Sequence, residues 1–278
     1  PWELFLDGKW DWNAFKEAAQ KLTHDPEGTG AASRFGVALC HYHDARIAYT
    51  TGEQLVSIEG KEIKSNLESN GIRRALQMLS DMVLVEKCAS PTRTPSEATT
   101  MFDEGRASMF MAPYFSNQSF PNLMEARTLG YVPYPKDPEA DKHYVASVAI
   151  GFFVPYGALN KQAIYALLTS GIATFASEST EGSEAYNTAK QRFLNDNKAY
   201  SYTEEDFNLR QEWEKTIKKT VTTVPSEVFV DVADPNDILS ALVGEGGAPV
   251  QDYAQILGVM KGSVEEKIQQ IMDQSSAE

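Results

Sequence analysis

Apolar residues in the segment 101–115 change from helical spacing to strand spacing within a few positions. Phe102 closes a short amphipathic helix, and Gly105 follows where a helix can end in the left-handed conformation. From 107 to 111 the pattern alternates with a period of two, which predicts a strand. Pro113 ends this strand because a proline nitrogen has no hydrogen to donate to a ladder. The segment therefore predicts a helix that leads directly into a short strand.

Helical spacing recurs in five other segments, most of which follow a residue that can cap a helix. Asp11 can cap the first helix with its side chain, and Asn70 and Asn160 precede the second and third. The segments 203–206 and 263–266 have the form of capping boxes, so a helix is expected to begin at each.

The strands expected from the same patterning are short and few. They lie at 35–39, 107–111 and 129–133, with a further pair within 144–154. Helical and strand patterns alternate along the chain. This alternation predicts an α/β fold and argues against a β-sandwich.

Charge and composition narrow the classes of partner. The chain has 278 residues, of which 42% are hydrophobic, and a net charge of −14 at pH 7. This charge argues against nucleic acid and anionic lipid, because both would be repelled. No apolar run approaches the roughly 20 residues that a membrane-spanning helix needs. The composition is typical of a secreted globular protein.

Cysteine and histidine give little sign of redox chemistry or metal binding. Cys40 and Cys88 could form a disulfide or remain buried thiols, and the sequence leaves both open. His41 and His43 could share one face of a strand but have no apparent third ligand, which favours polar residues at a strand exit. The segment 24–30 lacks most of the oxygen ligands of a calcium loop. We therefore expect no metal site and no cofactor.

Several segments resemble, in the same order, the extracellular solute-binding proteins of bacterial ABC importers. Phe102, Gly105 and Met109, with the aromatic Tyr114 beyond them, match that family's F..G.aaM...gp pattern. The resemblance is to the large carbohydrate-binding family, family 1, that includes maltose-binding protein. The other segments that resemble it are 1–23, 34–39, 52–57, 130–135, 149–155 and 160–163.

The resemblance implies a periplasmic-binding-protein type II fold, with this chain corresponding to the family's C-terminal portion. Residues 1–146 would form the first part of lobe two, and 147–199 a crossover with a remnant of lobe one. Residues 200–278 would be C-terminal helices that return to lobe two. The family's leader peptide and most of its first lobe would precede residue 1.

The resemblance also implies a function. Such a protein binds an oligosaccharide or other sugar in a cleft between two lobes and delivers it to the transmembrane subunits of an ABC permease. The full-length protein would work outside the cytoplasm, in the periplasm or at the cell surface. It would be held there by a lipid anchor that is absent from this chain. A binding protein of this kind is not an enzyme.

The binding residues are expected in the loops that follow the first two predicted strands, where open α/β sheets bind ligands. Tyr114 matches the position where family members place a stacking aromatic, and Phe115 is next, with a core role equally open. Trp10 and Trp12 lie at a helix start and are interpreted as core residues rather than stacking platforms. The residues expected to contact sugar hydroxyls are His41, Tyr42, His43, Asp44 and Asn117.

Two other function classes stay open. One is a surface interaction module without a small-molecule ligand, which would show an exposed apolar patch and no cleft. The other is a secreted glycosidase, which needs two carboxylates flanking a sugar. Asp44 with Glu53, or Asp103 with Glu104 beside a helix end, could be nominated for that role. The sequence has no GxSxG, HExxH or phosphate-binding glycine loop, which disfavours catalysis.

Overall fold

The chain divides into two compact units. The first unit comprises Pro1–Val148 and Thr220–Glu278, and the second comprises Ala149–Lys219. Among the described residues, no helix is both long enough and apolar enough to cross a membrane. The computed structural model describes residues 1–25, 32–39, 45–60, 62–91, 94–111, 120–125, 129–147, 160, 162, 163, 166, 182–196, 203–225 and 252–276.

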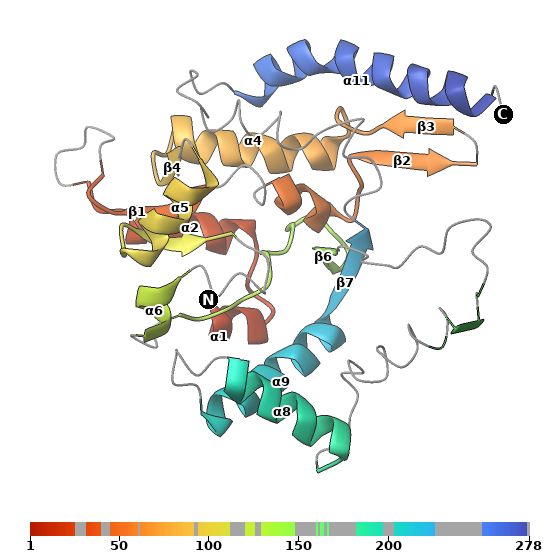
Figure 1. Cartoon of the computed structure of the whole chain (residues 1–278). Coiled ribbons are helices and arrows are strands. Elements are labelled where there is room, and N and C mark those ends of the chain that lie inside the picture. The colour runs from red at the N-terminus through yellow and green to blue at the C-terminus, as the bar shows by residue number, and fades with distance from the viewer. Residues whose placement is uncertain are drawn as a thin grey trace. The chain divides into compact units, whose positions relative to one another are not determined.

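A three-stranded parallel sheet lies in the core of the first unit (Figure 1). Its order is β4-β1-β5, with β4 at Ala89–Pro91, β1 at Phe35–Leu39 and β5 at Ala107–Phe110. The central strand β1 is buried along all but its first residue, as expected for a strand with neighbours on both sides. Because both neighbours run parallel to β1, the carboxyl ends of all three strands lie at one edge of the sheet.

Three helices pack against this sheet: α2 (Trp12–Leu22), α4 (Asn70–Leu84) and α5 (Pro95–Asp103). α5 ends before Gly105, whose φ of +72° is the left-handed conformation that the sequence predicts there. Each helix begins with a side chain that accepts a backbone hydrogen bond from its first turn, supplied by Asp11, Ser69 and Thr94.

The contact between α2 and β1 depends on Gly36. A Cβ at this position would lie 2.0 Å from the carbonyl oxygen of Ala19 and 2.5 Å from its Cα. The N–H of Gly36 also donates to the hydroxyl of Thr23 at 2.9 Å, which fixes the approach. Since the opposing atoms belong to the backbone, only glycine permits the two elements to lie this close.

The remaining elements of the first unit surround this core. The 3₁₀ helix η1 (Ala45–Thr51) and the C-terminal helix α11 (Tyr253–Ser276) both contact α4. Tyr253 is buried and donates from its hydroxyl to the carbonyl of Leu67 at 2.7 Å, and burial raises its pKa. The shorter elements are α1 (Trp2–Leu6), α6 (Pro121–Glu125), the antiparallel pair β2 (Val56–Glu59) and β3 (Glu62–Ser65), and the parallel pair β6 (His143–Ser147) and β7 (Val221–Pro225).

An ion pair between the half-buried Arg74 of α4 and the buried Asp137 joins α4 to the residues that follow 129–136. The guanidinium of Arg74 donates two hydrogen bonds to the carboxylate of Asp137, at 3.0 and 2.8 Å. Asp137 is only 1% exposed, and its carboxylate also accepts the N–H of Glu139 at 2.9 Å. The same guanidinium lies 5.4 Å from the ring centroid of Trp12 on α2. The hydrogen bonds to Asp137 hold the pKa of Arg74 above its ordinary value.

In the second unit, two of the described helices share an aromatic contact. They are α8 (Glu184–Asp196) and α9 (Glu204–Thr220). The ring of Phe207 on α9 lies 5.5 Å from each of two rings on α8, those of Tyr186 and Phe193. Edge-on and tilted ring contacts of this kind add to the burial of apolar surface that holds the two helices together.

Several local sequence predictions are confirmed. The strand at 35–39 is β1, and Asp11 caps α2 by accepting the N–H of Ala14 at 2.9 Å. The capping box at 203–206 is formed, with the N–H of Thr203 donating to Asp206 at 2.7 Å. Asn160 accepts the N–H of Ala163 at 3.1 Å, as a helix cap does.

Other local predictions are wrong or displaced. Residues 129–133 form no strand. Pro133 and Lys136 form hydrogen bonds with Trp10 and Trp12 instead of pairing with β5. α11 begins at Tyr253, where Asp252 accepts the N–H of Gln255, so the predicted start at Ser263 lies inside a continuous helix. Ser69 rather than Asn70 caps α4.

The two cysteines are not joined. Cys88 is a free, buried thiol whose pKa is raised to about 12, chiefly because burial disfavours the thiolate. Cys40 lies outside the described residues. Of the two alternatives that the sequence left open, the structure therefore shows the thiol for Cys88.

We predict that Gly36→Ala lowers the free energy of unfolding by about 1–3 kcal/mol, because the added methyl overpacks the backbone of Ala19. Urea denaturation of the two proteins measures the difference. Gly258→Ala is the matched control: it lies on an exposed face of α11 with no atom within 4 Å, so it should be neutral or stabilising. If both substitutions changed the free energy of unfolding equally, the close packing of Gly36 against Ala19 would not be the cause.

We further predict that Arg74→Met lowers the free energy of unfolding by about 3 kcal/mol, because it leaves the buried carboxylate of Asp137 without its cation. The same denaturation measurement applies. Lys21→Met, which breaks an exposed pair with Glu17, should have little effect. If Arg74→Met and Lys21→Met lower the free energy of unfolding by the same amount, burial of the carboxylate does not explain the effect.

Candidate functional site

The carboxyl edge of the parallel sheet is the first candidate site. β1 and β5 are neighbours and run in the same direction, with Val37 opposite Met109. The chain therefore leaves both strands at the same end of the sheet, into the segments 40–44 and 112–119. Open α/β sheets bind ligands at this end of their strands.

The binding residues expected from the sequence follow these two strands. They lie outside the described residues, so their positions stay predictions. They are His41, Tyr42, His43, Asp44, Tyr114, Phe115 and Asn117.

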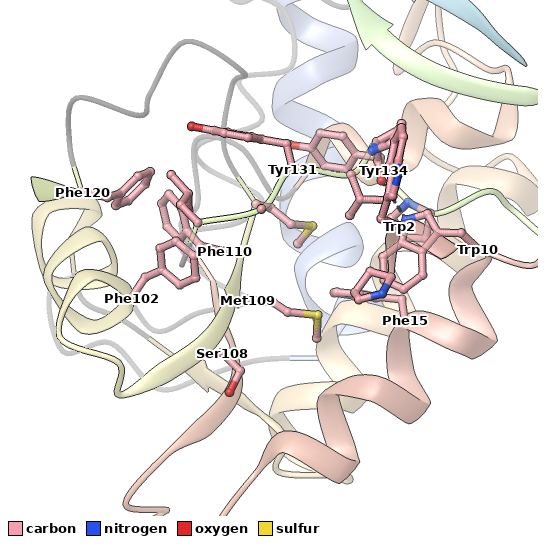
Figure 2. A pocket seen from close by; sticks show the side chains of 17 residues that line it. Trp2, Trp10, Phe15, Phe102, Ser108, Met109, Phe110, Phe120, Tyr131 and Tyr134 are labelled. Carbon is pink, nitrogen blue, oxygen red and sulfur yellow. Dashed lines mark hydrogen bonds between the residues drawn. The ribbon is translucent and has the colours of Figure 1, made fainter. Parts of the chain in front are cut away.

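A cavity of about 340 Å³ in the first unit is the second candidate site (Figure 2). It is lined by the four consecutive residues 108–111 of β5 and its end, and by the seven consecutive residues 129–135. This volume is within the range of small-molecule pockets. Its aromatic lining residues are Trp2, Trp10, Phe15, Phe102, Phe110, Phe120, Tyr131 and Tyr134.

Two groups of rings form much of the wall. Phe102, Phe110 and Phe120 contact one another, with ring centroids 5.1 to 5.7 Å apart. Trp10 meets Phe15 edge-on at 6.1 Å. In Figure 2 the three phenylalanines lie on one side of the cavity, and Trp10 and Phe15 lie on the other.

Side-chain and backbone hydrogen bonds of Trp10 and Trp12 hold the 129–135 wall in place. The indole N–H of Trp10 donates to the carbonyl of Pro133 at 2.8 Å. The N–H of Lys136 donates to the carbonyl of Trp10, and the N–H of Trp12 donates to the carbonyl of Lys136, each at 3.0 Å. The segment is thus bonded to the residues before α2.

Both tryptophans confirm the core interpretation made from the sequence. Trp10 is 4% exposed and Trp12 is 5% exposed, and the indole N–H of Trp12 donates to the hydroxyl of Thr50 at 3.0 Å. The sequence reasoning missed that Trp10 also lines a cavity. It also missed the three phenylalanines as a group, although the alternation at 107–111 places Phe110 away from the sheet's most buried residues.

Asp103 and Glu104, one of the two carboxylate pairs that a glycosidase could use, have structural partners. Asp103 accepts hydrogen bonds from the side chain of Asn122 and the N–H of Leu123, at 2.7 and 3.2 Å. Glu104 pairs with Arg106 at 2.8 Å. The described part of the chain contains no group of three or more His, Cys, Asp or Glu side chains that could hold a metal ion.

His143 supports the same wall from β6. Its Nε2 lies 2.6 Å from the carbonyl oxygen of Tyr134, and its ring meets Phe5 edge-on at 5.7 Å. Burial, reinforced by the charge of Lys136, lowers the pKa of His143 despite the opposing hydrogen bond to Tyr134. Folding therefore favours the neutral imidazole over its charged form.

Comparison with solved structures shows the periplasmic-binding-protein type II fold. The maltose/maltodextrin-binding domain MalE from Bdellovibrio bacteriovorus, bound to maltotriose, matches over 97% of this chain and 67% of its own, with 16% identity and a TM-score of 0.51. The ABC substrate-binding protein Lmo0181 from Listeria monocytogenes, in complex with cycloalternan, matches over 94% and 64%, with 16% identity and a TM-score of 0.53. UspC from M. tuberculosis matches over 91% and 64%, with 12% identity and a TM-score of 0.53.

The chain thus spans about two thirds of the length of these structures. Models of protein families and a search of curated proteins give no match. At identities of 12 to 16%, the likeness is one of fold.

We predict that the folded state loses stability as the pH falls below about 6.5, the ordinary pKa of histidine. The pKa of His143 is lower in the folded protein, so between the folded and the unfolded pKa the unfolded chain binds more protons. The contribution of His143 to the free energy of unfolding is therefore complete above the unfolded pKa and is lost as the pH falls toward the folded pKa. Melting temperatures at pH 7.5 and 5.5 measure the effect. His143→Gln should reduce the difference between the two pH values, and an undiminished difference would assign it to other groups.

Proposed function

We propose that this chain is part of the solute-binding component of a bacterial ABC importer that binds an oligosaccharide or other sugar. The observation that carries the proposal is the match of more than 90% of the chain to two binding proteins with sugars bound. Those proteins are the maltotriose complex of MalE and the cycloalternan complex of Lmo0181. The resemblance of the sequence segments to the same class of protein supports it independently.

The proposed sugar contacts lie in the segments that follow β1 and β5. Sugars need a flat apolar surface for their C–H faces and polar groups for their hydroxyls. Tyr114 and Phe115 would supply the first, and His41, Tyr42, His43, Asp44 and Asn117 the second. The parallel pairing of β1 with β5 supports this grouping, because it starts both segments at one end of the sheet.

The proposed mechanism is closure of two lobes around the sugar. Residues 1–146 and 200–278 would belong to lobe two, and 147–199 to a crossover with part of lobe one. A ligand shifts the balance between open and closed forms only as far as it binds the closed form better. The closed form would then dock on the transmembrane subunits of a permease, outside the cytoplasm, with the full-length protein held by a lipid anchor.

We predict that Tyr114→Ala weakens sugar binding by about 1–3 kcal/mol, a magnitude taken from stacking of bases on aromatic side chains. A glycan array identifies the ligand, and isothermal titration of the full-length protein then measures the affinity. The melting temperature should change little, because a stacking ring is partly exposed without its ligand. Tyr114→Phe keeps the ring and should retain most of the affinity.

Two results would contradict this proposal. If no glycan on the array binds, the sugar-binding function itself is wrong. If Tyr114→Ala lowers the melting temperature strongly but leaves the affinity unchanged, Tyr114 belongs to the core and the ligand lies elsewhere.

A further inference from the structure

The cavity runs along the edge of β5 at which no described strand is paired. Side chains of a strand alternate between its two faces, so four consecutive residues can line one cavity only along an edge or at an end. One edge of β5 pairs with β1, and no other described strand pairs with it. The seven consecutive residues 129–135 also line the cavity. The space therefore separates two stretches of backbone that are not bonded to each other by a ladder.

The aromatic walls of this cavity suit a flat ring. Rings of Phe102 and Phe110 are stacked at 23° and 5.7 Å, and Phe120 meets both edge-on. Phe102 and Phe110 are only half-buried although their rings pack together. A further aromatic ring can add to such a cluster in an offset or edge-on arrangement.

The chemistry of the described lining disfavours a charged or highly polar occupant. It includes no charged side chain, and its side-chain hydroxyls come from Ser108, Tyr131 and Tyr134. An ion placed there would lose its hydration without gaining a partner of opposite charge. A sugar ring would likewise find no carboxylate, amide or guanidinium among these side chains for its several hydroxyls.

We propose that this cavity binds an uncharged aromatic ring, edge-on or stacked between the Phe102–Phe110–Phe120 cluster and the wall that contains Trp10. The proposal goes beyond sugar binding, because the residues that line the cavity are not the residues proposed to contact the sugar. The ring can arrive as a free small molecule or as the aglycone of an aryl glycoside, which share this chemistry.

Titration with three small molecules tests the class of ligand. Phenol should bind the full chain at least tenfold more tightly than cyclohexanol, which has a similar size but no aromatic face. Phenyl glucoside, compared with phenol and glucose, separates the two sources: equal affinity for phenol and phenyl glucoside supports a free ring, and tighter binding of phenyl glucoside supports an aglycone. Failure of both phenol and phenyl glucoside to bind, or equal binding of cyclohexanol, would overturn the proposal.

A blocking variant ties the binding to this cavity. Gly130 lines the cavity, its φ is not positive, and a Cβ there meets no atom within 4 Å, so Gly130→Phe adds a ring without backbone strain. It should weaken ring binding at least tenfold. Gly258→Phe adds the same ring on the exposed face of α11 and should bind as the unchanged protein does. Unchanged binding by Gly130→Phe would place the ring elsewhere and overturn the assignment.

Hydrogen exchange separates ligand binding from simple closure of the gap. If 129–135 pairs with β5 in solution, the amides of Met109 and Tyr131 will be protected without any ligand, and the cavity proposal is wrong. Protection that appears only when phenol is added supports it. A glycan titration of the same samples distinguishes the two proposals. If phenol binds and no glycan binds, the proposed sugar-binding function is wrong but the cavity proposal stands.

Discussion

The buried carboxylate of Asp137 is the group on which the arrangement of the first unit most depends. A charge removed from water is costly unless a cation and hydrogen bonds compensate it, and Arg74 and the N–H of Glu139 supply both. Arg74 also lies over Trp12, whose indole N–H is bonded to Thr50. One buried charge thereby fixes the positions of α4, α2, η1 and the residues after 136 relative to one another.

That relation explains why the predicted strand at 129–133 does not form. Backbone and indole hydrogen bonds tie Pro133 and Lys136 to Trp10 and Trp12, directly before the residue that Arg74 holds. The segment therefore ends at a fixed distance from α2 instead of aligning with β5. The apolar residues that suggested a strand still avoid water, but they do so by lining a cavity with the rings of α5 and β5.

Features set by a few neighbouring residues could be predicted from the sequence, and features set by distant partners could not. Asp11, Gly105 and Thr203 act within one helical turn, so their caps follow from local spacing. Ser263 has an equally good local pattern, but Ile256, Val264 and Ile268 form one buried face across it, which favours a continuous helix. Strand β4 has only three residues, too few to show alternation, and its pairing depends on β1.

The candidate sites show the same division, and β5 connects them. Local spacing identified β5 and the aromatic pair beyond it, but an aromatic-walled cavity requires side chains from α1, α2, α5 and 129–135 to meet, which no single segment reveals. Met111 lines the cavity and is the last described residue before 112–119, which contains Tyr114. Recognition of several hydroxyls is helped by carboxylate, amide or imidazole groups, which the described cavity lining lacks. The segments after β1 and β5 contain Asp44, Asn117, His41 and His43. If one ligand occupies both the cavity and the site formed by the segments after β1 and β5, its apolar ring and its polar part must be joined at the end of β5.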